Sequence, residues 1–140
     1  MSNFKLNTTF SDILLADTCL TVGSNIRFEA SLLNVRLKKR NHMGGFSKAS
    51  IGLCENFTFS NRSIGNSYLT FLDFVEGRHS FCKSITRSKT PFLILGAAVK
   101  KRLDSNSNDL LLSILYKNSK YIEKNWFGFN FLGTTASSFA

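Results

Sequence analysis

The sequence predicts a mainly β protein, an antiparallel sandwich or jelly-roll-like single domain with a short N-terminal helix. Apolar and polar residues alternate with a period of two in several segments, which is the pattern of half-buried strands. These segments are short and separated by turn-forming residues, as in antiparallel sandwiches and barrels. A chain of 140 residues suits one core. We therefore expect a single β-rich domain over 1-140, with an N-terminal arm or helix at 1-25 and a β core at 26-137.

The first elements follow from local patterns near the N-terminus. Residues 8–18, TTFSDILLADT, are the best helix candidate, with Thr9 or Ser11 as the cap. In residues 26–37 apolar side chains alternate with polar ones, and the phase slips by one residue at Leu32-Leu33. Since one extra residue moves the apolar set to the other face, we expect a strand with a β-bulge there.

The later strands are expected from the same alternation. Residues 51–59 and 68–75 flank a turn-rich loop and predict a long hairpin. Residues 91–95, PFLIL, begin another strand. In residues 110–116 the spacing of the apolar residues does not distinguish a strand from a helix, and the short length of this segment favours a strand. The aromatic segment 125–131, NWFGFNF, is expected to be the last strand.

The formal charge of +9 is concentrated in the middle of the chain. Residues 36–102 hold thirteen Lys and Arg against three carboxylates, whereas the two flanking segments are close to balanced. Such an excess generates a positive field that attracts polyanions, either nucleic acid or an anionic membrane surface.

The basic clusters supply the candidate site. Long cationic side chains neutralise phosphates without reading sequence, and nearby Ser and Thr hydroxyls add phosphate hydrogen bonds. Phe46 and Phe81 would stack on unpaired bases, although most Phe residues are expected in the core. The predicted nucleic-acid-binding residues are Arg36, Lys38, Lys39, Arg40, Arg78, Lys83, Arg87, Lys89, Lys100, Lys101 and Arg102.

No cofactor, metal site or enzymatic activity is predicted from the sequence. His79 and Cys82 have metal-ligand spacing, but zinc needs at least three protein ligands and the other thiols are single residues far away in sequence. Neither GxGxxG nor a Walker loop is present. The N-terminus lacks an apolar leader, and no apolar run approaches the ~20 residues of a membrane span. We expect an intracellular protein with reduced thiols.

The second half of the chain resembles the thirty-kilodalton superfamily of plant-virus movement proteins. YLTFLDFVEG would carry the family's strand aspartate at Asp73, WFGFNFLGTTAS its closing strand, and SKASIGLCENFTFS the strand before them. The chain is shorter than such proteins usually are and stops at the last motif. The resemblance implies sequence-independent binding of single-stranded nucleic acid and a location in the host cytoplasm or at cell junctions.

Two function classes therefore stay open. The first is a sequence-independent nucleic-acid-binding protein, of the viral cell-to-cell movement type, whose partner is single-stranded RNA or DNA. The second is a structural subunit of a nucleoprotein assembly, capsid-like or ribosome-associated, that uses the same basic face. Homo-oligomerisation and peripheral contact with an anionic membrane are further open alternatives.

Overall fold

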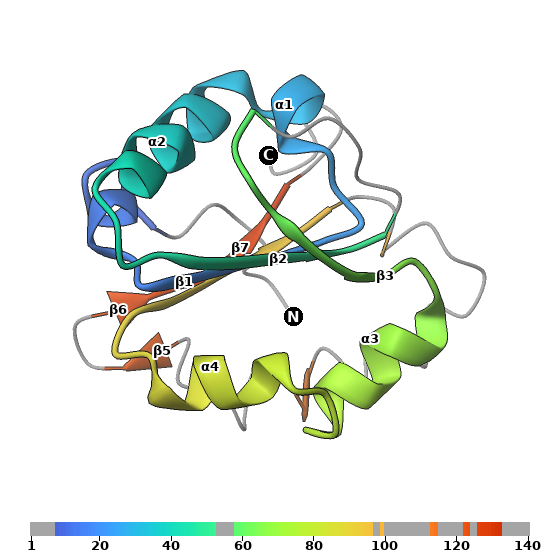
Figure 1. Ribbon diagram of the computed structural model, residues 1–140. Coiled ribbons are helices and arrows are strands. Elements are labelled where there is room, and N and C mark those ends of the chain that lie inside the picture. The colour runs from blue at the N-terminus through green and yellow to red at the C-terminus, as the bar shows by residue number, and fades with distance from the viewer. Residues whose placement is uncertain are drawn as a thin grey trace.

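The fold is α/β and is built on one all-parallel sheet (Figure 1). The computed structural model describes residues 8–52, 58–96, 99, 113–114, 122–123 and 126–132. Five strands lie in the order β3-β2-β1-β4-β7, and β5 and β6 form a separate antiparallel pair. The strands are β1 (Thr18–Val22), β2 (Ser47–Ile51), β3 (Arg62–Gly65), β4 (Pro91–Leu95), β5 (Ile122–Glu123), β6 (Trp126–Phe127) and β7 (Phe129–Phe131).

Helices cover both faces of the sheet, giving three layers (Figure 1). Two helices and a short 3-10 helix lie on one face, and the two later helices lie on the other. The helices are η1 (Asp12–Leu15), α1 (Ile26–Glu29), α2 (Ser31–His42), α3 (Tyr68–Val75) and α4 (Phe81–Arg87).

Two apolar cores follow from alternation along the central strands. Leu20 of β1 and Leu93 of β4 pack with α3 and α4, whereas Cys19 and Phe92 pack with α1 and α2. Every residue of β1 and β4 is buried. A parallel strand covered on both faces is apolar at nearly every position instead of at alternate ones.

The predicted antiparallel fold is therefore wrong. Every pairing within the five-stranded sheet is parallel. Residues 26–37 form α1 and the first part of α2, and the buried apolar residues of α2, Leu33 and Leu37, are spaced by four. That spacing places side chains on one side of a helix. The alternation came from Phe28 and Leu32, which are exposed.

The predicted hairpin over 51–75 is also wrong. Residues 68–75 form α3, whose N-cap Ser67 accepts a hydrogen bond from the Thr70 backbone N–H through its side chain. Phe71 and Phe74, three residues apart, are buried beneath this helix. The strands that pair with β2 are β1 and β3, and both run parallel to it.

Some elements agree with the sequence-based expectations. Residues 91–95 form β4, and 129–131 within the aromatic terminal segment form β7. The segment expected to be an N-terminal arm instead contributes β1, the central strand of the sheet. Most of 110–116 and residues 53–57 of the expected 51–59 strand lie outside the described residues. The single-domain division over 1–140 stays a prediction.

Candidate functional site

In an open α/β sheet, a functional site is expected at the carboxyl edge of the strands. From β1 the chain builds outward through β2 and β3 on one side, and β4 then adds on the other side of β1. Open α/β sheets bind ligands outside the carboxyl ends of the strands where the order reverses. Here that position lies between β1 and β4, at Gly23 and Gly96.

The two glycines hold the ends of β1 and β4 in close contact. A Cβ atom added at Gly96 would lie 2.2 Å from the Gly23 carbonyl oxygen. The Gly96 N–H donates to the Val22 carbonyl at 2.8 Å, and the Gly23 N–H donates to the Ile51 carbonyl at 2.9 Å. Gly23 has a φ of 63°, in the left-handed region that glycine tolerates. These backbone groups therefore bind one another instead of facing a ligand.

The polar side chains after β1 are also used within the protein. The Ser24 hydroxyl is buried and donates to the Glu29 carboxylate at 2.7 Å. The Asn25 side-chain oxygen accepts from the Arg27 backbone N–H at 3.2 Å, and so caps α1. This local arrangement fixes α1 and the start of α2 above the sheet.

The two thiols that the structure describes, Cys19 and Cys82, do not form a reactive or metal-binding group. Burial raises the pKa of Cys19 to about 12, so this side chain is a neutral thiol at ordinary pH. Burial also raises the pKa of Cys82, whose Sγ donates to the Phe74 carbonyl at 3.3 Å. His79 Nδ1 accepts from the Phe81 backbone N–H. Among the described residues, no three His, Cys, Asp or Glu side chains gather to hold a metal ion.

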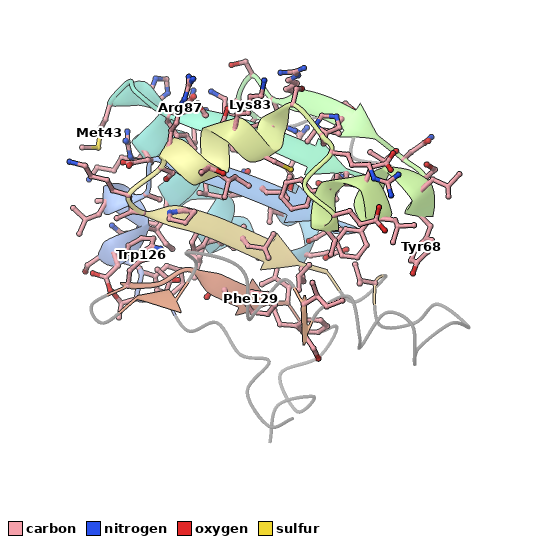
Figure 2. The ribbon with its side chains drawn as sticks, turned by 90° about the horizontal axis from the view of Figure 1, so that it is seen from below. Met43, Tyr68, Lys83, Arg87, Trp126 and Phe129 are labelled. Atoms are coloured by element: carbon pink, nitrogen blue, oxygen red, sulfur yellow. The ribbon has the colours of Figure 1, made fainter. Side chains whose placement is uncertain are left out.

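The predicted basic residues that the structure describes do not form one face. Arg36, Lys38 and Lys39 are exposed on α2, whereas Lys83 and Arg87 are exposed on α4, across the sheet. Figure 2, seen from the α4 side, shows Lys83 and Arg87 on this helix. The charge excess is therefore divided between the two outer layers of the molecule.

Other predicted basic residues are tied to the protein itself. Arg40 is buried, and its guanidinium donates to the carbonyls of Ala16 and Gly44, each at 2.7 Å. Arg78 forms ion pairs with Glu76 and Asp73.

Lys89 lies in the loop after α4, where its side chain is exposed and its backbone N–H donates to the Asp17 carboxylate at 3.1 Å. Lys100, Lys101 and Arg102 lie outside the described residues.

A shallow hollow lies near the amino ends of β2 and β3. Its volume is about 320 Å³. The Lys48 ammonium lies 5.9 Å from the Phe46 ring centroid, and the Arg40 guanidinium lies 5.2 Å from the same centroid. Lys48 also donates to the Asn41 side-chain oxygen. The two contacts with the Phe46 ring are cation–π pairs. Together with the hydrogen bond to Asn41, they anchor the loop between α2 and β2. The lining residues are Phe46, Lys48, Ser60, Asn61 and Arg62.

Comparison with known proteins identifies the family. The model of the molybdopterin oxidoreductase family matches residues 1–140. The chain belongs to the molybdopterin oxidoreductase family. The resemblance to plant-virus movement proteins is therefore wrong, because the short aromatic and glycine motifs that suggested it lie in a parallel α/β fold.

Three relatives of this molybdopterin oxidoreductase family member are subunits of NADH-oxidising enzymes. It is 42% identical over 137 residues to the NADH-ubiquinone oxidoreductase 75 kDa subunit of Reclinomonas americana. It is 35% identical over 138 residues to an NADH-quinone oxidoreductase subunit of Rickettsia typhi. It is 29% identical over 139 residues to the mitochondrial NADH dehydrogenase (ubiquinone) iron-sulfur protein 1 of Solanum tuberosum.

These matches cover 98%, 96% and 99% of the chain, but only 20%, 20% and 19% of the relatives. Among solved structures, a formyltransferase/hydrolase complex from Methylorubrum extorquens matches with a TM-score of 0.50 and 13% identity. That match covers 91% of this chain and 39% of the other, and it shows the fold alone.

The relatives overturn the functional predictions. Proteins named as oxidoreductase subunits contradict both the nucleic-acid-binding function and the expectation of a protein with no enzymatic role. The relatives are named as subunits of oxidoreductases, which contradicts the prediction of single-stranded nucleic acid as the partner. One relative is named as mitochondrial, which contradicts a location in a virus-infected cytoplasm or at cell junctions. No helix within the described residues is long and apolar enough to cross a membrane.

The family name implies a molybdopterin group, and the described residues do not fit one. The junction of β1 and β4 is closed by the contact between Gly23 and Gly96. The thiol of Cys19 is buried near the amino end of β1, away from the carboxyl edge, with a pKa raised to about 12. The Ser24 hydroxyl is bonded to Glu29. No chemical step is therefore assigned to a molybdopterin on these residues.

Sequence reasoning missed the junction of β1 and β4, although a signal was present. TCLTVG and PFLILG are both apolar-rich runs of five residues followed by glycine. Short apolar runs ending at glycine are typical of buried parallel strands. Recognising two of them would have predicted the carboxyl edge of a parallel sheet.

Proposed function

We propose that this chain is part of an NADH-quinone oxidoreductase subunit, in which it serves as a structural unit that assembles through protein contacts. The observation that carries the proposal is the 42% identity to the Reclinomonas americana subunit over 98% of the chain. The NADH-oxidising activity would belong to the assembled enzyme and its other parts.

A structural role is supported by how the polar groups are used. The groups at the carboxyl edge of β1 and β4 bind one another, as do Ser24 and Glu29. Arg40, a buried cation, holds the turn after α2 against η1 through carbonyl oxygens. Such bonds stabilise a fixed arrangement and leave few groups for chemistry.

A single domain over 1–140 is part of the same proposal. It is supported by contacts between the two ends of the described chain. The Thr8 N–H donates to the Asn130 side-chain oxygen at 2.9 Å, and the Asn130 amide donates back to the Thr8 hydroxyl at 2.8 Å. Asn130 is fully buried on β7, which pairs with β4.

Native purification from the source organism tests the proposal. An affinity tag on the chain should retain a multi-protein complex that reduces a quinone with NADH, because the relatives are subunits of such enzymes. The purified chain alone should oxidise no NADH. Recovery of the chain without any NADH-oxidising partner, or bound to nucleic acid instead, would contradict the proposal.

A further inference from the structure

Large apolar side chains are exposed along the outer side of α1 and α2. Phe28 is 75% exposed, Leu32 72%, Val35 61% and Met43 63%. Leu32, Val35 and Met43 are separated by three and eight residues, so they lie on the side of α2 that faces away from the sheet. Exposed large apolar residues are ordinary when scattered, but a set on one side of a helix marks an interaction surface.

The same side of α2 carries positive charge, and no salt bridge to these cations is formed among the described residues. Arg36, Lys38 and Lys39 are exposed, and α2 contains no Asp or Glu. The carboxylate of Glu29 on α1 accepts a hydrogen bond from Ser24. Exposed apolar side chains flanked by exposed Arg and Lys side chains are complementary to an apolar surface flanked by carboxylates.

We propose that this docking face binds an amphipathic helix with an apolar side and Asp or Glu residues beside it. The docking face consists of Phe28, Leu32, Val35, Arg36, Lys38, Lys39 and Met43. The helix would come from the part of the oxidoreductase subunit that lies outside the fifth of the relatives matched by this chain. The inference rests on the proposed function, because only assembly into such a subunit supplies that polypeptide.

Two observations support an amphipathic helix from the remaining subunit as the partner. They are the length of the relatives and the spacing of the apolar residues on the docking face. About four fifths of each relative lies outside the match, which leaves a large polypeptide surface to cover this domain. Apolar anchors spaced along one side of α2 suit a second helix packed by ridges and grooves. Carboxylates on that helix would pair with Arg36 and Lys39 at the rim of the contact.

Photo-cross-linking in the assembled enzyme tests the occupant. A photoreactive amino acid replaces Leu32, the complex is purified and irradiated, and cross-linked peptides are identified by mass spectrometry. The matched control carries the same amino acid at Leu69 of α3, which is 68% exposed on the other side of the sheet. Position 32 should cross-link to an acidic amphipathic segment of the remaining subunit, and position 69 should not.

Each other outcome overturns the inference. Cross-links from position 32 to lipid, to another copy of this chain or to an unrelated subunit would identify a different occupant. Cross-linking no stronger than at position 69 would mean that the face is free. If the chain is not found in an NADH-oxidising complex at all, the proposed function fails as well, and the two failures are thereby distinguished.

Charge reversal tests the rim of the docking face separately. Arg36→Glu with Lys39→Glu should reduce the chain recovered in the complex by about tenfold or more, since like charges would then oppose each other. Lys83→Glu with Arg87→Glu on α4 makes the same change in net charge and should leave recovery within about twofold. Circular dichroism should be unchanged in both, because exposed cations contribute little to stability. Equal losses from the two pairs would mean that net charge alone drives assembly, which overturns the inference.

Discussion

Replacing Gly96 with alanine would place a methyl group against the backbone of the neighbouring strand. The added Cβ would lie 2.2 Å from the Gly23 carbonyl oxygen, 2.6 Å from the Gly23 carbonyl carbon and 2.7 Å from the Ser24 Cβ. Two of these atoms belong to the backbone, so no side-chain rotation relieves the contact. The ends of β1 and β4 would have to separate.

The expected loss of stability has two sources. Overpacking of this kind costs about 1–3 kcal/mol. Separation of the strands also weakens the hydrogen bond from the Gly96 N–H to the Val22 carbonyl, which contributes about 1 kcal/mol. We therefore expect Gly96→Ala to lower the free energy of unfolding by about 2–4 kcal/mol. At about 4 °C per kcal/mol for a chain of this size, the melting temperature should fall by roughly 8–16 °C.

Urea unfolding followed by far-ultraviolet circular dichroism measures this loss. Gly44→Ala is the control, because Gly44 has a φ of 77° but nothing within 4 Å of an added Cβ. That substitution tests the cost of a left-handed conformation without a steric contact, about 1 kcal/mol. If Gly96→Ala loses no more stability than Gly44→Ala, the close contact of β1 and β4 is not present in the protein.

Three further predictions concern buried polar groups and a buried thiol. Arg40→Met should lower the free energy of unfolding by about 1–3 kcal/mol in urea titrations, because it leaves the buried Ala16 carbonyl without this donor, whereas Lys38→Met should change it by less than about 0.5 kcal/mol. Asn130→Ala should cost about 2 kcal/mol in the same assay, since it removes both hydrogen bonds to Thr8; a loss under about 0.5 kcal/mol would contradict the buried pair. Burial raises the pKa of Cys19 from 9.0 to about 12, so the folded state holds the thiol proton more tightly and stability should fall as the pH rises from about 9 to about 12. Cys19→Ala should lose that part of the pH dependence, and identical pH profiles for the two proteins would refute the assignment.

The central strands were only partly predictable from sequence. PFLIL was recognised as a strand because it is short, apolar and starts with proline, and it forms β4. Whether this strand pairs parallel or antiparallel to its neighbours was not predictable from the same features. A parallel strand buried on both faces and an antiparallel sandwich strand both give short apolar runs, and the distinction depends on helices between the strands. Two of the helical segments, 26–37 and 68–75, were mistaken for strands.

The error over 26–37 has a physical cause. A helix packed on one side only should be polar on the other, and that contrast reveals its period. In α2 the exposed Leu32 and Val35 remove the contrast, so the apolar residues imitate the alternation of a strand. Phe28, Leu32 and Val35, whose alternation imitates a strand, are also apolar residues of the proposed docking face. Departures from local consistency are expected where a surface serves a partner.

The basic clusters are visible in the sequence, but the placement of their side chains was not predictable. All four cations of RLKKR were predicted to bind nucleic acid, yet Arg40 donates to carbonyl oxygens of the protein itself. Residues four apart in sequence lie about one helical turn apart, so Arg36 and Arg40 project from nearly the same side of α2. Arg40 is buried because its guanidinium donates to the carbonyl of Ala16, which follows η1, whereas Arg36 is exposed. Lys83 lies across the sheet. Only the packing of the layers decides which cations face solvent together.

NADH-dependent quinone reduction in the source organism tests the central claim most directly. With the gene for this chain deleted, the activity should fall to background, because the oxidoreductase would lack one of its parts. Wild-type chain should restore the activity, and Gly96→Ala should restore it only to the extent that the variant folds. Unchanged quinone reduction by NADH in the deletion strain would contradict the account.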